Sequence, residues 1–404
     1  MLFIFLISTA LLGSCQIFGK APSGDSYFVH AEGNDRNDGL SEETPFRSLF
    51  KAMAMAVSTP IKTITVMGTL DVESEQSTNR ERVFLIQGMS PQAILIRGIG
   101  DNPAVLSAEG SNRRVVLVRG TVPIHFENIE ISGGVSISEG GGILVGPGST
   151  LTLGTGAVIR NNYAATIGGG IMVSSGASLF IEGGSVLDNR SASAGGGIGV
   201  VGQNSSLVVL EGIISRNYAA GGAGVAMYQS STFIFSGGAI RDNEAEMTGG
   251  GIMLNNEAVF TMEGGEISNN RSGNSGGGMV ILDRSEFNLA GGDISANHAG
   301  EHGGGIASDE SGIINIQSGY IGANQAEIRG GGVFSAGVLI KSGGTIYGSD
   351  VPEDTANNAA EGSAVFIFRN DGLYRIREAS AGVDTVLSTA ADEGWTISSP
   401  AADE

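Results

Sequence analysis

The sequence contains a single cysteine, Cys15, among 404 residues. One cysteine excludes a disulfide framework and any site built from several thiolates. Charged residues are also scarce, at 16% of the chain against about a quarter in an average soluble protein. Those present are mainly acidic, with 42 Asp and Glu against 22 Lys and Arg and a net charge of −20. Nucleic acids and anionic membrane surfaces attract basic proteins, so neither is an expected partner.

The apolar run at the N-terminus, residues 1–12, is too short to span a bilayer as a helix. The tetrapeptide Leu12-Gly13-Ser14-Cys15 follows it and resembles the lipobox of bacterial lipoproteins, in which the cysteine is acylated. The resemblance implies a signal peptide over residues 1–14, lipid attachment at Cys15 and a tether over residues 15–26. The alternative is a buried structural cysteine. A lipid anchor implies export and a place in the outer membrane or at the cell surface.

Glycine is abundant, with 66 residues, and it recurs at a fixed step. Blocks of small residues end on a glycine that is followed by an aliphatic residue or Met, and the step between blocks is 27 residues after a first step of 28. These glycines are Gly142, Gly170, Gly197, Gly224, Gly251, Gly278, Gly305 and Gly332. An asparagine column keeps nearly the same step, at Asn162, Asn189, Asn217, Asn243, Asn270, Asn297 and Asn324. Such a period predicts a solenoid, in which each repeat packs only on its neighbours.

Each repeat contains three short β-type runs separated by glycine and polar turns, and it lacks the 3.6-residue periodicity of a helix. Each repeat is therefore expected to form one coil of a parallel β-helix over residues 61–369. Alternation predicts inward side chains such as Ile171 and Val173 in the first strand, and Leu179 and Ile181 in the second. We expect the asparagine column to form an internal structural ladder whose side-chain amides bond turn backbone.

The Gly-Gly-Gly-Ile blocks, with Ile-x-x-Asn about eight residues upstream, resemble the repeats of right-handed parallel β-helix proteins of the pectate-lyase-like superfamily. Chlamydial polymorphic outer-membrane proteins carry similar repeats. The segment with Tyr27-Phe28-Val29, residues 33–39 and Thr44-Pro45-Phe46 resembles the capping segment of secreted bacterial β-helix proteins. These resemblances imply an all-β, right-handed fold, which hosts lyases, hydrolases, adhesins and inert spacers alike.

The N-terminal segment, residues 27–60, is expected to cap the open apolar end of the stack. The sequence predicts a helix over residues 46–57, with Thr44 as its N-cap and Pro45 at its first position. The apolar side chains expected to seal the core are Phe46, Leu49, Phe50, Met53 and Val57. Residues 370–404 lie outside the repeat pattern and form a C-terminal tail.

The outward positions of the first strand contain no ionisable side chain, so a pectinase-like cleft is not expected on that face. They are Leu144, Met172, Gly199, Ala226, Met253, Val280, Ala307 and Phe334. Two interpretations remain open for this apolar strip. It could contact a partner or a second copy of the chain, or turn residues of adjacent coils could cover it.

The strongest acidic constellation is Asn256, Asp283 and Glu310, which lie 27 residues apart in the turn after the first strand. Stacked carboxylates repel unless a cation intervenes, so the column could bind Ca²⁺ or another ligand; the alternative is a hydrated turn. A second, weaker column is Glu266 and Asp293. The letters from His298 to His302 match an inverted zinc-protease motif, but that chemistry needs a helix, and a β-coil is expected here.

The sequence therefore favours a lipid-anchored envelope protein that presents a rigid β-helix surface for adhesion, or for binding an envelope or host glycan or protein. No catalytic residue is assigned, and no cofactor apart from the tentative calcium. One alternative is a polysaccharide lyase or hydrolase with Asp283 and Glu310 as its acidic centre. Another is a structural spacer without a ligand.

Overall fold

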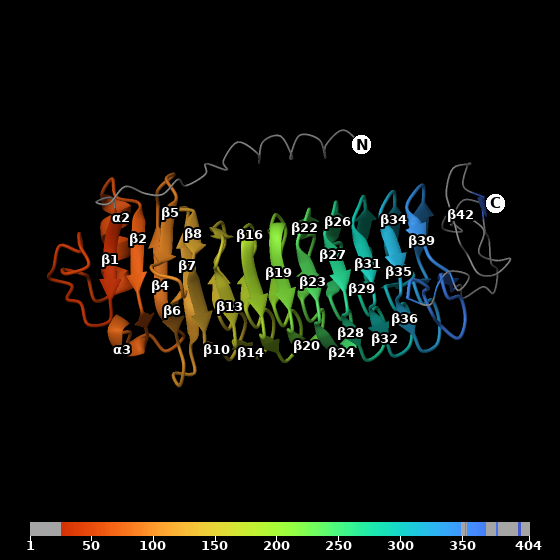
Figure 1. The fold of residues 1–404 in the computed structure, drawn as a ribbon, viewed down its shortest axis with the longest axis horizontal. Helices are drawn as coiled ribbons and strands as arrows, with labels where there is room; N and C mark the ends of the chain where they lie inside the picture. Colours follow the sequence, from red (N-terminus) through yellow and green to blue (C-terminus); the bar gives the residue numbers. More distant parts are fainter. Residues whose placement is uncertain (1–25, 349–351, 353, 369–376, 379–394, 397–404) are drawn as a thin grey trace.

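The computed structural model describes residues 26–348, 352, 354–368, 377–378 and 395–396 of the chain. Parallel coils follow one another along one long axis, from the N-terminal cap to the last coil (Figure 1). Three parallel sheets form the sides of the stack, which confirms the predicted parallel β-helix. Cys15, the predicted signal peptide and the predicted tether up to residue 25 lie outside the described residues, as does most of the predicted tail.

The glycine blocks precede eight strands of an 11-stranded sheet, in which each strand pairs in parallel with the strand one coil away. Its members are β4 (Arg82–Gly88), β7 (Arg114–Gly120), β11 (Ile143–Val145), β15 (Ile171–Val173), β18 (Ile198–Val201), β21 (Val225–Tyr228), β25 (Ile252–Leu254), β29 (Met279–Ile281), β33 (Ile306–Ser308), β37 (Val333–Ser335) and β40 (Val365–Ile367). The 27-residue step keeps the register, so that Ile171 pairs with Ile198 and Ile198 with Val225.

A 21-stranded sheet combines the second and third strands of the coils. One ladder consists of β1 (Ser26–His30), β2 (Thr63–Met67), β5 (Ile94–Gly98), β8 (Ile124–Glu127), β12 (Thr150–Leu153), β16 (Ser178–Leu187), β19 (Ser206–Ser215), β22 (Thr232–Phe235), β26 (Val259–Met262), β30 (Glu286–Leu289), β34 (Ile313–Ile316) and β38 (Val338–Lys341). The other consists of β3 (Thr69–Leu70), β6 (Ala104–Ser107), β9 (Ile129–Ser132), β13 (Val158–Arg160), β23 (Ala239–Arg241), β27 (Glu266–Ser268), β31 (Asp293–Ser295), β35 (Tyr320–Gly322) and β39 (Thr345–Ile346). The long strands β16 and β19 belong to both ladders and join them.

A third sheet of eight very short strands was not anticipated from the sequence. Its members are β10 (Val135–Ser136), β14 (Tyr163–Ala164), β17 (Arg190–Ser191), β20 (Tyr218–Gly221), β24 (Glu244–Thr248), β28 (Arg271–Ser272), β32 (His298–Ala299) and β36 (Gln325–Ala326). Most have two residues, too few to show an alternating pattern. All of them except β10, which follows Gly134, come directly after an asparagine of the column. In addition, β41 (Arg377–Glu378) pairs antiparallel with β42 (Trp395–Thr396).

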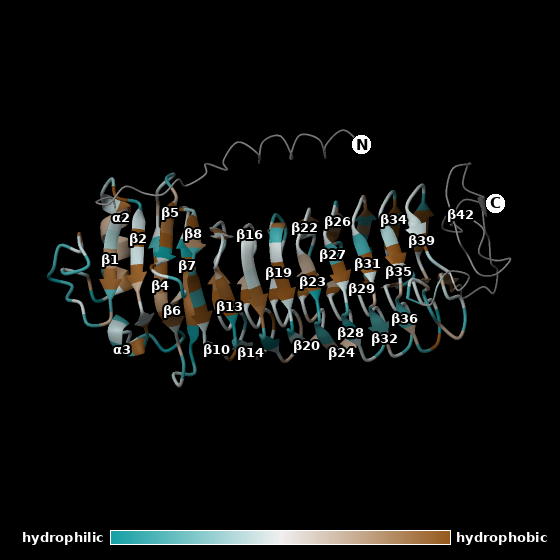
Figure 2. Cartoon of the chain, in the orientation of Figure 1, coloured by the Kyte–Doolittle hydropathy of each residue, from teal (hydrophilic) through white to brown (hydrophobic). Residues whose placement is uncertain are grey.

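The core is the interior of the coils, where like residues lie over like residues. Ile171, Val173, Leu179 and Ile181 are all fully buried, as the alternation predicts. The hydrophobic residues run along the strands of successive coils, whereas the short ladder around β28 and β32 is hydrophilic (Figure 2). Phenylalanines at one position of three coils stack through the centre, with ring centroids 4.6 Å apart for Phe233 and Phe260 and 5.0 Å apart for Phe260 and Phe287.

The capping helix begins later than the sequence predicts. Helix α2 spans Leu49–Ser58, and its N-cap is Ser48, whose hydroxyl accepts a hydrogen bond from the N–H of Lys51. The predicted cap, Thr44, instead donates its hydroxyl to Asp38 at 2.7 Å. The Asp35 carboxylate accepts the N–H groups of Arg47 and Ser48, both at 2.9 Å, and so holds the chain non-helical up to that point.

The sealing role predicted for the apolar side chains of this segment is correct except at one position. Phe46, Leu49 and Met53 are buried against the first coils and Val57 packs on the core, but Phe50 is 56% exposed. A second short helix, α3 (Val72–Glu75), was not predicted and is closed by a capping box between Asp71 and Ser74. Neither α2 nor α3 is long and apolar enough to cross a membrane, and the described residues contain no other helix.

The stack begins inside the segment predicted as a cap, because β1 pairs in parallel with β2. The other edge of β1 is also occupied. The N–H groups of Phe28 and His30 donate to the carbonyls of Gly39 and Phe46, and the N–H of Phe46 donates back to Phe28. The chain between Gly39 and Phe46 therefore covers the first edge, which would otherwise invite pairing with another strand.

A buried carboxyl links the two cap helices. Glu75 of α3 accepts the N–H groups of Leu49 at 2.8 Å and Phe50 at 3.0 Å, which are the first N–H groups of α2. Burial raises the pKa of Glu75 to about 7, against the lowering effect of these two hydrogen bonds. The folded protein therefore holds this proton more tightly than the unfolded chain does.

This raised pKa predicts a loss of stability with rising pH. Between about pH 4.5 and pH 7 the folded state binds more protons than the unfolded state, so the free energy of unfolding falls as pH increases. The measurement is urea unfolding at several pH values in this window. The Glu75→Gln variant should show a shallower slope, whereas the control Glu73→Gln, on the exposed side of α3, should keep the parent slope. An unchanged slope in Glu75→Gln would contradict the assignment.

Candidate functional site

The seven asparagines of the column lie inside the stack as a continuous ladder, each at most 2% exposed. Asn189 shows the pattern. Its Nδ2 donates to the carbonyls of Ile159 at 2.9 Å and Leu187 at 3.0 Å and to Oδ1 of Asn217 at 3.1 Å, while its own N–H donates to the same Oδ1. These buried amides are occupied by backbone and by one another, so the ladder supports the coils and offers no binding surface.

The ladder has an eighth rung that the sequence did not reveal. Asn357 is 1% exposed and accepts both the N–H and the Nδ2 of Asn324, at 2.9 and 3.0 Å. The step from residue 324 to residue 357 is 33 instead of 27, which hid this asparagine from the periodic pattern. The last coil therefore contains six extra residues.

The glycine and asparagine columns are coupled by contact. A Cβ added at Gly170 would lie 2.9 Å from Nδ2 of Asn189 and 2.7 Å from the carbonyl oxygen of Gly197. A side chain at this position would therefore push on the ladder and on the next coil at once. The same arrangement at the other blocks explains why both columns keep one period.

The outward apolar strip is largely covered by the chain itself, which is the second of the two interpretations left open by the sequence. Ala226, Met253, Val280 and Ala307 are at most 7% exposed and form a small second core with Ala194 of a neighbouring turn. At Gly199 the covering residue is Ile167, whose Cγ2 would lie 2.2 Å from an added Cβ. The strip is thus not an open surface for another copy of the chain.

The acidic turn lies where the register predicts. Leu254, Ile281 and Ser308 pair across successive strands, and Asn256, Asp283 and Glu310 each follow two residues later. Two of its backbone groups serve turn-to-turn bonds: the N–H of Ser230 donates to Asn256 O, and the N–H of Glu257 donates to Asp283 O.

Side chains next to the acidic turn also form bonds between successive turns. Asp309 Oδ2 accepts the N–H of Asp283 at 2.8 Å, and Arg284 pairs with Glu257 at 2.9 Å. The described residues contain no group of three or more His, Cys, Asp or Glu side chains placed to hold a metal ion. The tentative calcium cluster therefore gains no support from this geometry.

The two histidines of the zinc-like motif, His298 and His302, contact different partners. His298 is in β32 and contacts Glu327, with 2.9 Å between Nε2 and Oε1. His302 stacks on Phe334, with ring centroids 4.7 Å apart, and burial lowers its pKa. Neither histidine lies on a helix, so the helical geometry that the zinc-protease motif needs is absent at these residues.

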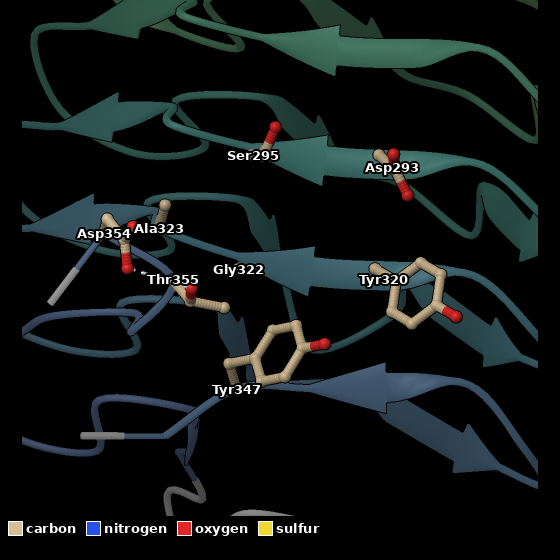
Figure 3. Close-up of a pocket in the computed structure, with 8 residues that line it drawn as sticks. All are labelled: Asp293, Ser295, Tyr320, Gly322, Ala323, Tyr347, Asp354 and Thr355. Atoms are coloured by element: carbon tan, nitrogen blue, oxygen red, sulfur yellow. Dashed lines mark hydrogen bonds between the residues drawn. The ribbon is translucent and has the colours of Figure 1, made fainter. Parts of the chain in front are cut away.

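A pocket of about 260 Å³ opens on the outer face of the 21-stranded sheet near its C-terminal end (Figure 3). Its floor comes from successive strands β31 and β35 and the end of β39. Ile294, Ile321 and Ile346 of these strands point into the core, so their neighbours point outward. The lining residues, named here the tyrosine pocket, are Asp293, Ser295, Tyr320, Gly322, Ala323, Tyr347, Asp354 and Thr355.

Two parallel tyrosine rings dominate the tyrosine pocket. Tyr320 and Tyr347 have centroids 6.4 Å apart and planes inclined by 8°, and Tyr320 is 54% exposed. Gly322 provides room for the second ring, because an added Cβ would lie 2.7 Å from Cδ2 of Tyr347. The matching residues one and two coils earlier are serines, Ser295 and Ser268. Glycine thus replaces serine at position 322, where a side chain would collide with the ring of Tyr347.

The remaining wall comes from the longer last coil. Asp354 and Thr355 lie between Tyr347 and Asn357, where the chain is six residues longer than in the regular repeat. The carbonyl of Thr355 accepts the N–H of Ala323 at 2.7 Å, which fastens this wall to the floor. The described lining residues include two carboxylates, Asp293 and Asp354, and no Lys, Arg or His.

Sequence reasoning identified only part of this site. Asp293 was noted in the weaker acidic column with Glu266, but the tyrosines and the last-coil wall were missed. The signal that could have found them is the interrupted period between Asn324 and Asn357, because an irregular coil in a regular solenoid often carries the function.

Comparison with known proteins identifies the fold. Residues 104–247 match the family model described as the right-handed β-helix region. No curated protein matches the chain. The match lies within the stack of parallel coils that the structure describes, and its ladders continue on both sides of it. The chain is a parallel β-helix repeat protein.

Proposed function

We propose that this protein is an exported, lipid-anchored envelope protein whose β-helix is a rigid, non-catalytic scaffold for binding a glycan, through the tyrosine pocket. The observation that carries the binding role is the pair of parallel tyrosine rings on the sheet face, of which Tyr320 is exposed and Tyr347 is half-buried. Aromatic faces offer a flat apolar platform beside polar groups, which suits the apolar face of a sugar ring.

A non-catalytic role is supported by the geometry of two described regions, the acidic turn and the outward face of the first strand. General acid–base or nucleophilic chemistry needs groups within hydrogen-bond reach of one another and of a substrate. The acidic turn uses its backbone and the neighbouring Asp309 for bonds between turns, and the first-strand face is buried and apolar.

The anchor is supported by the lipobox-like Leu12-Gly13-Ser14-Cys15. The expected result is that a fatty-acid label is incorporated into the parent protein in bacterial cells and that Cys15→Ser abolishes the label. The same variant should shift the protein from the membrane fraction to the soluble fraction, because a lipid chain is the proposed attachment. Labelling that persists in Cys15→Ser would contradict the anchor.

The binding role is tested with the purified full-length chain in mild detergent and a broad panel of polysaccharides, with calcium and with chelator. We expect retention of at least one polymer without any oligosaccharide product, and loss of that retention in Tyr320→Ala but not in the control Tyr163→Ala. Oligosaccharide release would instead favour the lyase or hydrolase alternative. In that case alanine at Asp283 and Glu310 would show whether the acidic turn is its centre.

A further inference from the structure

The tyrosine pocket lies at the end of an acidic track on the sheet surface. Glu266 pairs in register with Asp293, and Asp293 pairs with Tyr320, so the three outward side chains follow one another on adjacent strands. Adjacent parallel strands are about 4.8 Å apart. Asp354 adds a carboxylate from the last-coil wall. A ligand that passes from β27 to the pocket therefore meets carboxylates and then aromatic rings.

One cation of this sheet face is already paired with a carboxylate. Arg241 lies one coil before Ser268 and binds Asp242 with 2.7 Å between Nη1 and Oδ2. None of the eight described lining residues is basic, and the whole chain carries a net charge of −20. Anionic ligands such as uronic-acid polymers would be repelled, whereas a positive charge would relieve the repulsion between neighbouring carboxylates.

The two tyrosine rings also favour a positively charged ligand. Parallel tyrosine faces attract cations through their π systems as well as providing apolar contact. The space of about 260 Å³ is just below the range of about 300–1,000 Å³ for drug-sized ligand sites, so it suits one ring of a longer chain.

We propose that the tyrosine pocket binds an amino sugar whose amine is free and protonated, with the pyranose ring against Tyr320 and Tyr347 and the ammonium group beside Asp293 or Asp354. The inference rests on the proposed function, since it specifies the glycan that this surface recognises. It assigns specificity to two features of this chain, the carboxylates of the track and the glycine that admits the second ring.

The test is calorimetric titration of the full-length protein with three oligosaccharides of equal length: a glucosamine oligomer, its fully N-acetylated form and a galacturonic acid oligomer. The glucosamine oligomer should bind at least about ten-fold more tightly than the acetylated form, as expected for a hydrogen bond to a charged group. The galacturonic acid oligomer should not bind. Rising salt should weaken the glucosamine complex, because its carboxylate partners are exposed.

Variants separate charge from stacking. Asp293→Asn should lower the affinity for the glucosamine oligomer about ten-fold and leave the affinity for the acetylated oligomer unchanged. Gly322→Val should weaken the binding of both oligomers, because the added side chain would meet the ring of Tyr347 and the carbonyl oxygen of Thr355 without changing charge. The matched controls are Asp101→Asn, on an exposed turn near the other end of the stack, and Tyr163→Ala; both should bind as the parent does.

The outcomes that contradict the inference differ from those that contradict the function. Equal affinity for the free and acetylated amines would overturn the amino-sugar assignment and leave glycan binding intact. Absence of saturable binding for every sugar, in this titration and in the polymer panel, would overturn both. Tighter binding of a lysine oligomer than of the glucosamine oligomer would indicate that the acidic track binds basic peptides. That result would contradict the amino-sugar assignment.

Discussion

Replacing Asn243 by alanine is expected to lower the free energy of unfolding by about 3–5 kcal/mol, since several buried groups lose their partners together. Asn243 Oδ1 accepts the N–H and the Nδ2 of Asn217, both at 3.0 Å. Its Nδ2 donates to the carbonyl of Ile214 at 3.0 Å and to Oδ1 of Asn270 at 2.9 Å. Alanine at position 243 would leave the N–H of Asn217 and the carbonyl of Ile214 without these partners. Both groups lie inside the stack, where water cannot take the place of the Asn243 amide.

Urea unfolding followed by circular dichroism measures this effect. The matched control is Asn315→Ala on the outer face, where Nδ2 donates to Glu286 and Asn288 but water can take over. We expect the control to lose less than about 1 kcal/mol. Equal losses in the two variants would mean that the buried ladder is not the main source of polar stabilisation.

Replacing Phe260 by alanine is expected to cost a comparable amount, about 3–5 kcal/mol, through the cavity left in the core. Phe260 is fully buried and its ring lies between those of Phe233 and Phe287. In a solenoid the neighbouring coils cannot close the gap without moving whole strands, because each ring contacts only the coil before and the coil after it.

Thermal and urea unfolding of this variant should be compared with two controls. Leucine at position 260 keeps most of the volume and should recover at least half of the loss. Alanine at Phe50, which is 56% exposed, should have little effect on stability. The cavity argument fails if Phe50→Ala and Phe260→Ala destabilise the protein equally.

The regular coils could be predicted from the sequence because every level of structure repeats with one period. A 27-residue step places glycine against asparagine and aliphatic residue over aliphatic residue, as Gly170, Asn189 and Ile198 illustrate. Parallel stacking in register satisfies all of these contacts at once. The pattern therefore predicted the fold, the inward side chains and the position of the ladder.

The irregular ends could not be predicted in the same way, because each depends on contacts without a repeat. The start of α2 is decided by Asp35, which is thirteen residues from Ser48. Lys341 occupies an inward position opposite Ile316, where burial lowers its pKa to about 8 and its amine donates to the carbonyl of Gly344. The tyrosine pocket arises from an extended coil and a single glycine, whose role appears only when Tyr347 is placed above it.

The occupied edges of the inner strands have a consequence for resistance to proteolysis. Proteolytic enzymes commonly bind their substrate as an extended segment that adds to their own sheet. Each strand in the interior of the stack has a partner on both sides, and β1 is covered by the chain from Gly39 to Phe46. Strands at the ends of the other ladders, such as β4 and β40, pair on one side only. A digesting enzyme would therefore find cleavable backbone mainly in turns, while the hydrogen-bonded coils hold the nicked pieces together and keep the surface they present.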